Sequence, residues 1–459
     1  MSSSILHIKP EEIDTVEKRG KYTVSIIGCG QIGVLHACLF AEAGFRVKCV
    51  DADQTIVNNI VRGKMPHLKR EIGLKLKNYA KTGLLNATTD AKTTASQSDV
   101  IAITVPVEID KKKKANYSNL ENICKHVGSG LHNGSLVVLM STVGIGVTQG
   151  LIKEVLENTS GLKVGADFGL AYSPIQLLNG QTLETLANQE RIVAATDKNS
   201  LNAALTIIGT FTKGCLSKTE CIKTTETVTL FKAMQQDVNV ALANELALFC
   251  EKAGIDYLEA HKLATIDACP ALSLPTFISG NIREDSYLLL DNSENLNFKL
   301  RVPTIAREIN EEIIKHAVNL SKDALRNCGK TLRRTRISLL GILQVPNMKS
   351  APKKIVEELA KMLETKGAKV SVYDPYFSGD ETGEMQYHLK KNLSEALEGV
   401  DCILILTAHD QFKRLNLKKL KALMKMPAAI VDLEGIVEPD KVEKEGFVYR
   451  GLGRGVWTK

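Results

Sequence analysis

Two parts of the chain alternate between short, continuous apolar runs and longer runs with helical spacing. In the first part the apolar runs are residues 22–28, 47–51, 100–106, 135–142 and 163–174, with helical patterns between them. Continuous apolar runs are typical of parallel strands that are covered on both faces. Strand–helix alternation therefore predicts a doubly wound α/β sheet, Rossmann-like in form. A second, smaller sheet is predicted from Thr335 onward, with strands at 336–341, 369–374, 401–407 and 428–433.

Between the two sheets, residues 225–252 keep helical spacing throughout. At 1.5 Å per residue this predicts a helix of about 40 Å, which ends at the glycine stop of Gly254. Its apolar face is expected to be core or interface, and consists of Leu230, Phe231, Met234, Val238, Leu242 and Leu246. A chain of 459 residues is too long for one core, so we expect an extension (1–20), a first sheet domain (21–213), a central helical domain (214–328) and a second sheet domain (329–459).

Composition narrows the class of protein. The chain is 44% hydrophobic and 24% charged, and no apolar run reaches the ~18 residues that cross a bilayer. The polar N-terminus has no secretory signal pattern. The ten cysteines show neither CxxC pairs nor zinc spacing, which indicates a reducing, cytoplasmic compartment and no metal site.

The net charge of +7 is spread along the chain, with the densest basic runs at Lys111–Lys114 and Lys413–Lys425. These runs fall in a loop and on an amphipathic helix, without interleaved aromatic residues. Solvated faces are therefore favoured over a nucleic-acid surface, although a positive field would help to attract an anionic nucleotide.

The strongest local signal is GCGQIG at 28–33, which joins the strand 22–28 to a helix. In such a loop Gly28 allows a tight turn, Gly30 lets the backbone approach a pyrophosphate, and Gly33 lets helix and strand pack closely. Asp51 ends the next strand, 23 residues after Gly28, where its carboxylate would accept the ribose hydroxyls. A 2′-phosphate would be repelled, so NAD is predicted rather than NADP. The alternative is a Rossmann-like domain with an empty site.

Other strands end on the same side of the predicted sheet, where ligands of such folds bind. Val105 and Pro106 end one strand, and Ser141 and Thr142 end the next. We expect the Thr142 hydroxyl to face the cofactor; the alternative is a strand-end hydroxyl bonded to backbone.

From residue 21 to 455 the chain resembles the UDP-glucose/GDP-mannose dehydrogenase family, closest to its UDP-N-acetylmannosamine branch. The similar motifs, in the family's order, are GCGQIG, STVGIGVT (141–148), YSPIQLLNG (172–180), DVNVALANELALFCEKAGID (237–256), AREIN (306–310), VYDPYF (372–377), LTAHDQFK (406–413) and GLGRG (451–455). The resemblance implies NAD, a nucleotide-sugar substrate oxidised twice at a primary alcohol, a homodimer through the long helix and a place in polysaccharide biosynthesis. The cofactor residues it implies are Gly28, Gly30, Gln31, Ile32, Gly33, Asp51, Val105, Pro106 and Thr142.

At the family's catalytic positions the residues differ. Asn281 stands in place of the nucleophilic cysteine, Thr229 and Ala233 in place of a lysine and an asparagine on the long helix, and Ile175 in place of a glutamate. An amide cannot hold an aldehyde covalently as a thiolate does, and isoleucine cannot take a proton. Only Thr142 and Asp285 are retained from the catalytic set, and Tyr287 also keeps its place.

Substrate-side positions differ as well. Ala271 replaces an arginine in a shortened glycine-poor loop, Val345 replaces a lysine, and Glu434 replaces an anion-binding arginine. Another thiol does not substitute for the missing one, since Cys269, Cys215 and Cys221 are expected to be small buried thiols.

Three hypotheses follow. The chain is an NAD-dependent nucleotide-sugar dehydrogenase, for example of a UDP-N-acetylhexosamine. Alternatively, it is a catalytically silent NAD- or nucleotide-sugar-binding protein, or a regulatory partner subunit. The third hypothesis keeps a single hydride transfer without the covalent step. Loss of a nucleophile–base set costs ~10⁴-fold or more, so the full four-electron oxidation is not expected.

Overall fold

The computed structural model describes residues 4–65, 68, 70–175, 182–264, 272–278, 280–349, 352–377 and 388–457. The chain divides into two compact units, of which the first contains Met1–Ala233 and Glu284–Lys299 and the second Met234–Arg283 and Leu300–Lys459. The boundary falls inside α10 (Ile222–Ala253) and α12 (Asn281–Asn295). The predicted domain limits remain a prediction, since residues 214–328 contribute to both units.

The first unit is built on an eight-stranded sheet in the order β10-β9-β8-β7-β4-β1-β2-β3. All neighbouring strands run parallel except β8 and β9, which are antiparallel. The strands are β1 (Thr23–Ile27), β2 (Arg46–Val50), β3 (Leu85–Thr88), β4 (Val100–Ile103), β7 (Leu136–Leu139), β8 (Gly169–Tyr172), β9 (Arg191–Ala195) and β10 (Leu216–Thr219), and β5 (Glu108–Ile109) pairs with β6 (Ala115–Asn116) in a separate hairpin. Three of the strands, β4, β7 and β8, are buried at every position, and β1 is buried at all but its first, as the continuous apolar runs predict.

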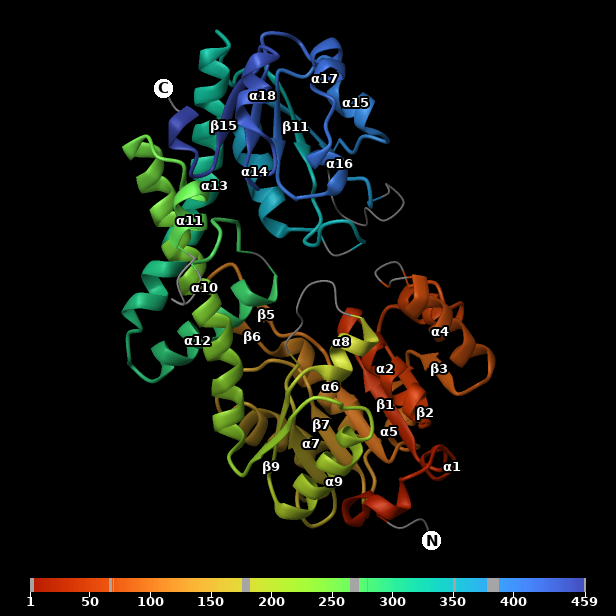
Figure 1. Ribbon diagram of the computed structural model, residues 1–459. Coiled ribbons are helices and arrows are strands. Elements are labelled where there is room, and N and C mark those ends of the chain that lie inside the picture. The colour runs from red at the N-terminus through yellow and green to blue at the C-terminus, as the bar shows by residue number, and fades with distance from the viewer. Residues whose placement is uncertain are drawn as a thin grey trace. The chain divides into compact units, whose positions relative to one another are not determined.

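Helices flank this sheet (Figure 1). They are α1 (Val16–Arg19), α2 (Gln31–Ala43), α3 (Gln54–Val61), α4 (Arg70–Lys81), α5 (Ala91–Ala95), α6 (Ser118–Gly128), α7 (Lys153–Ser160), α8 (Leu183–Asn188) and α9 (Lys198–Gly209), with short turns η1 (Ile5–His7), η2 (Pro10–Glu12) and η3 (Thr148–Ile152). The strand expected at 163–174 is shorter than predicted. Gly165 has a φ of +82°, and the Asp167 carboxylate accepts the backbone N–H of Lys163 at 2.8 Å, so a turn precedes β8.

The second unit carries a five-stranded, all-parallel sheet in the order β12-β11-β13-β14-β15. Its strands are β11 (Arg336–Leu340), β12 (Lys369–Tyr373), β13 (Cys402–Ile405), β14 (Ala429–Asp432) and β15 (Val448–Gly451). Its helices are α11 (Tyr257–Ala264), α13 (Arg301–Asn327), α14 (Lys354–Thr365), α15 (Leu393–Leu397), α16 (Asp410–Lys413), α17 (Leu417–Leu423), α18 (Pro439–Lys444) and the turn η5 (Gly455–Trp457). One apolar core joins α13 and α14 to the sheet, and another joins α15, α17 and α18 to it.

The mostly parallel first sheet, the all-parallel second sheet and the helical central region confirm the predicted fold class. The predicted long helix is α10, and it ends at Gly254, which has a φ of +72°. Across the described residues, no helix combines the length and apolar character that a membrane span requires.

Candidate functional site

The glycine loop at the end of β1 has the geometry of a phosphate-binding turn. Gly28 has a φ of +93°, and a Cβ there would lie 2.9 Å from Val105. A Cβ on Gly33 would lie 2.0 Å from the Gly28 carbonyl oxygen, so this glycine permits α2 to pack against the loop. A Cβ on Gly30, in contrast, would meet no atom of the protein within 4 Å. Packing therefore explains Gly28 and Gly33, while the space beside Gly30 is left for a ligand.

The N-terminus of α2 faces this space without a side-chain cap. Gly30 is the N-cap residue and makes no side-chain hydrogen bond to the first turn, which begins at Gln31 and Ile32. The unpaired N–H groups and the positive end of the helix dipole form a site that favours a phosphate.

Asp51 lies directly after β2 and supports the loop. Its Oδ2 accepts the Cys29 N–H at 2.7 Å, and its Oδ1 accepts the Asp53 N–H at 3.0 Å. The side chain is half-buried, so each oxygen keeps a lone pair for a further donor. The Thr104 hydroxyl donates to the Gly28 carbonyl at 2.6 Å and completes the support. The sequence interpretation missed Thr104, because its role depends on the pairing of β1 with β4.

Thr142 follows β7 at the same edge of the sheet. It is half-buried, and in the described part of the chain its hydroxyl has no hydrogen-bond partner. Its neighbour Ser141 instead donates to the Ile103 carbonyl at 3.3 Å. Val105 is buried and Pro106 exposed beside the loop. The backbone-bonded alternative for Thr142 is thus not what the structure shows.

A buried polar cluster lies at the ends of β7 and β8. Burial raises the pKa of Tyr172 well above its ordinary value, and the charge of Glu226 adds to the effect, while the Val143 backbone and Thr229 beside the hydroxyl oppose it. Burial also raises the pKa of Asp285 to about 7, with a further contribution from the charge of Glu284. Of the two residues that the resemblance identifies as retained, Asp285 is thus the one whose pKa is raised.

Glu226 of α10 is fully buried and holds the loop after β7. Its Oε2 accepts the Gly146 N–H at 2.6 Å, and its Oε1 accepts the N–H and hydroxyl of Thr148 at 3.0 and 2.7 Å. Burial raises the pKa of Glu226, and the hydrogen bonds from Thr148 and Gly146 lower it. This glutamate positions the STVGIGVT loop, a role that sequence spacing did not reveal.

The substituted positions are buried where their side chains are described. Thr229 and Ala233 lie one turn apart on α10 and are 4% and 5% exposed. Ile175 is 5% exposed and packs in the main apolar core of the first unit. Asn281 is the first residue of α12, and its side chain lies outside the described residues, as do Ala271 and Cys269. None of the three described substitutions provides an ionisable group.

None of the described cysteines lies at a substituted catalytic position. Cys215 and Cys221 are exposed, so the expectation that they are buried is wrong, whereas the other seven cysteines of the described chain are buried. The Thr224 side-chain and backbone donors lower the pKa of Cys221, which precedes α10. Among the described residues no group of three or more His, Cys, Asp or Glu side chains has the arrangement of a metal site.

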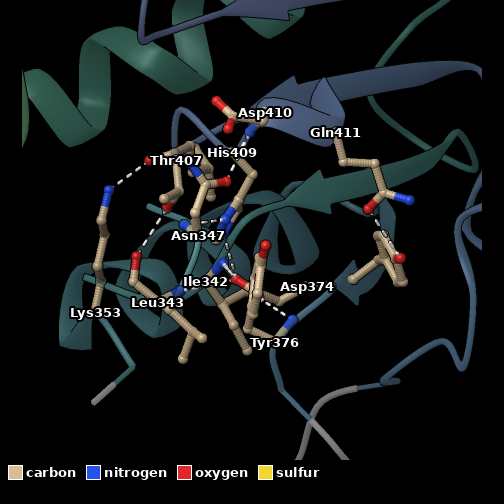
Figure 2. Close-up of polar contacts among 12 residues, drawn as sticks. Ile342, Leu343, Asn347, Lys353, Asp374, Tyr376, Thr407, His409, Asp410 and Gln411 are labelled. Atoms are coloured by element: carbon tan, nitrogen blue, oxygen red, sulfur yellow. Dashed lines mark hydrogen bonds and ion pairs between the residues drawn. The ribbon is translucent and has the colours of Figure 1, made fainter. Parts of the chain in front are cut away.

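In the second unit, Asp374 organises the loops at the carboxyl ends of the strands (Figure 2). Its Oδ2 accepts the N–H groups of Ile342 and Leu343 at 2.8 and 3.1 Å and the His409 Nε2–H at 3.1 Å, and its Oδ1 accepts the Tyr376 N–H at 2.9 Å. His409 Nδ1 accepts the Asn347 N–H at 2.9 Å, so the ring proton resides on Nε2. The tautomer is therefore defined by its two neighbours.

Glu434 occupies the position of the family's anion-binding arginine, so an acid that pairs with a lysine replaces a base. Glu434 Oε1 lies 3.4 Å from Lys353 Nζ, which also donates to the Leu406 carbonyl at 2.5 Å. Nearby, burial raises the pKa of Asp432 to about 6, while the Val437 and Glu434 N–H groups lower it. Val345, at the position of the family's lysine, is buried.

The chain matches three family models in order. The NAD binding domain of the UDP-glucose/GDP-mannose dehydrogenase family matches residues 22–211, the central domain residues 223–312 and the UDP binding domain residues 344–439. A UDP-N-acetyl-D-mannosamine dehydrogenase of Pyrococcus horikoshii is 29% identical over 437 residues, covering 94% of this chain and 99% of the relative. A UDP-glucose 6-dehydrogenase of Rhizobium meliloti is 24% identical over 447 residues, covering 94% and 99%.

Solved structures of similar dehydrogenases have the same fold as this chain. The UDP-D-ManNAc dehydrogenase from Pyrococcus horikoshii superposes with a TM-score of 0.86 at 28% identity, covering 95% of this chain and 100% of that one. An NDP-N-acetyl-D-galactosaminuronic acid dehydrogenase from Methanosarcina mazei Go1 gives a TM-score of 0.79 at 26% identity, covering 98% and 99%.

Proposed function

Because the chain belongs to the UDP-glucose/GDP-mannose dehydrogenase family, we propose that it binds NAD and a UDP-sugar but does not complete the family's four-electron oxidation. The family and its cofactor NAD, both predicted from the sequence, are confirmed by the matched domains and relatives. The substrate class and the missing oxidation are the proposal.

NAD fits the residues of the first unit. The open space beside Gly30 and the uncapped start of α2 would hold the pyrophosphate, and Asp51 would accept the ribose hydroxyls. Thr142, whose hydroxyl is without a partner in the described chain, would contact the cofactor from β7. When bound, NAD supplies a hydride acceptor.

For the substrate, the match to a UDP binding domain at 344–439 supports a UDP-sugar at the strand ends of the second unit. Relatives named UDP-N-acetyl-D-mannosamine dehydrogenase support a UDP-N-acetylhexosamine. Glu434 argues for altered contacts there, because a carboxylate repels phosphate where the family has an arginine.

One observation carries the loss of the four-electron reaction: Thr229, Ala233 and Ile175 are buried and none can ionise. Holding an aldehyde as a thioester and hydrolysing it requires a nucleophile and groups that move protons. Loss of such a set costs ~10⁴-fold or more. These residues therefore favour a catalytically silent binding protein or partner subunit over an enzyme that completes the four-electron oxidation.

A single oxidation is the second candidate, and Asp285 favours it. A carboxyl with a pKa of about 7 is matched to proton transfer at neutral pH. Its carboxylate would accept the proton of the sugar's primary hydroxyl as the alcohol loses its hydride and becomes an aldehyde. This step needs no thiol.

NADH stoichiometry separates these outcomes. Purified protein would be incubated with NAD and UDP-N-acetylmannosamine, UDP-N-acetylglucosamine or UDP-glucose, with binding measured in parallel by calorimetry. Binding without NADH supports the proposal, and one NADH per sugar supports the single oxidation. Two NADH per sugar would overturn both, and absence of any binding would refute the UDP-sugar assignment.

We also propose a homodimer through α10. Phe231, Leu242 and Phe249 on this helix are 58%, 47% and 64% exposed, and apolar side chains of this size are usually covered when they share one element. The free thiols of the described chain support a reducing, cytoplasmic location.

A further inference from the structure

A pocket of about 390 Å³ lies on the second unit between α15, α16 and α17. Its apolar part comes from the Tyr373 ring and leucines such as Leu397 and Leu420, and its polar part includes Gln411, Arg414 and Lys419. The volume is in the range of small-molecule sites, which are also mostly apolar with a few polar groups.

The pocket is separate from the strand-end contacts around Asp374. Tyr373 belongs to the core that joins α15 and α17 to the sheet, and its ring packs edge-on against Phe412 with centroids 6.3 Å apart. Its hydroxyl donates to Gln411 Oε1 at 3.2 Å. In Figure 2 Gln411 lies apart from the His409–Asp374 contacts. The pocket thus opens on the helical flank of the sheet.

The residues that line the pocket include two cations, Arg414 and Lys419, and no Asp or Glu. Residues 411–431 contain six Lys or Arg residues and no acid. Lys413 is paired with Asp410 at 3.2 Å. The side chains of Arg414 and Lys419, in contrast, make no hydrogen bond or ion pair with any residue that the structure describes. The basic run that the sequence alone assigned to a solvated face therefore places two cations at a cavity, and neither side chain has an ion-pair partner within 4 Å among the described residues.

We propose that this pocket binds a small phosphorylated metabolite, a sugar phosphate or a mononucleotide, at a site separate from those for NAD and the UDP-sugar. Arg414 and Lys419 pair with the phosphate, since guanidinium and ammonium groups are the usual phosphate partners in proteins. Tyr373 and the leucines pack against the ring of the ligand, and the Gln411 amide hydrogen-bonds to its polar edge. The position suits an effector site, because none of these residues belongs to the proposed cofactor or substrate sites.

The test compares two double variants that lose the same charge. Arg414→Ala/Lys419→Ala removes the cations at the pocket, and Lys418→Ala/Lys421→Ala removes two exposed lysines of α17 that do not line it. Calorimetric titrations with glucose 1-phosphate and with UMP are expected to show binding to the wild type and to the control. In the pocket variant we expect the affinity for both ligands to fall by about tenfold or more.

Two results would overturn the proposal. One is the absence of binding to the wild type, and the other is an equal loss in both variants, which would indicate a general basic surface such as one that binds nucleic acid. NAD affinity measured on the same three proteins keeps this test independent of the proposed function, since neither double variant touches the first unit.

Discussion

Asp51 and Asp374 hold the same place in the two sheets. Asp51 follows β2, which pairs with β1, and Asp374 follows β12, which pairs with β11. Each carboxylate accepts the N–H of the residue that follows a glycine in the left-handed conformation, Cys29 at 2.7 Å and Ile342 at 2.8 Å. The glycines, Gly28 and Gly341, have φ values of +93° and +86°. The two units thus repeat one device for closing the turn after the first strand.

The two carboxylates differ in what else they bind. Asp51 accepts one further N–H, that of Asp53, whereas Asp374 also accepts Leu343, Tyr376 and His409. The oxygens of Asp374 are therefore used by the protein, and those of Asp51 retain acceptor capacity for a ribose. This supports the prediction of one dinucleotide site, in the first unit.

Gly30→Val is expected to abolish NAD binding while the protein keeps its melting temperature, because the new side chain would occupy the ligand's space and meet no protein atom at its Cβ. Calorimetry with NAD and a thermal melt measure the two effects. Gly150→Ala, whose Cβ also meets nothing within 4 Å, is the control. Unchanged NAD affinity in Gly30→Val would remove this loop from the cofactor site.

Asp374→Asn is expected to destabilise the second unit by about 2–4 kcal/mol, since an amide cannot accept all four hydrogen bonds and leaves buried N–H groups unpaired. Trp457, the chain's one tryptophan, lies in this unit and reports its unfolding in urea. Asp410→Asn, at a 57% exposed side chain, should change stability by less than about 0.5 kcal/mol. Equal effects of the two variants would contradict the role given to Asp374.

Asp285 should make the first unit less stable as the pH rises. Its pKa is raised from 3.8 to about 7, so the native state binds the proton more tightly than the unfolded state. This contribution is fully present below about pH 4 and is lost as the pH passes 7, with an upper limit of about 4 kcal/mol. Asp285→Asn should flatten the decline in melting temperature over this interval.

In that experiment the melting temperature of the variant is subtracted from that of the wild type at each pH. The subtraction is needed because Asp432, with a pKa raised to about 6, lowers the stability of both proteins as the pH rises. Parallel profiles of wild type and Asp285→Asn would show that Asp285 ionises at its ordinary pKa.

Ile175→Glu should destabilise the protein by about 3–5 kcal/mol and restore no activity, since it places a charge in an apolar core. Val61→Glu, at a 55% exposed position, is the control and should be nearly neutral. Chemical denaturation measures both. A stable Ile175→Glu variant with increased NADH formation would show instead that this position still faces the reaction.

Phe249→Glu is expected to convert the proposed homodimer into monomers, because it places a charge on the exposed apolar side of α10. Size-exclusion chromatography with light scattering gives the mass directly, and Val61→Glu again serves as a surface control. A wild-type monomer, or an unaffected dimer in Phe249→Glu, would exclude this face as the interface.

Local pattern was enough to predict much of the fold. The runs 100–106 and 135–142 contain β4 and β7, and the helical spacing of 225–252 contains all but the ends of α10. The strand expected at 163–174 was too long, because a glycine turn interrupts a run that composition alone makes continuous. The antiparallel β9 depends on long-range pairing, which has no signature in its own residues.

By itself the sequence determined the two α/β sheets, the glycine loop and the absence of a thiol at position 281, because these depend on residue type and on short-range spacing. Only the tertiary structure decided that Ile175 lies in a core, that Glu226 holds a loop 78 residues away, and that His409 meets Asp374. Such contacts join strand ends and helices that are distant in the chain. They exist only after packing has brought those segments together and excluded water from between them.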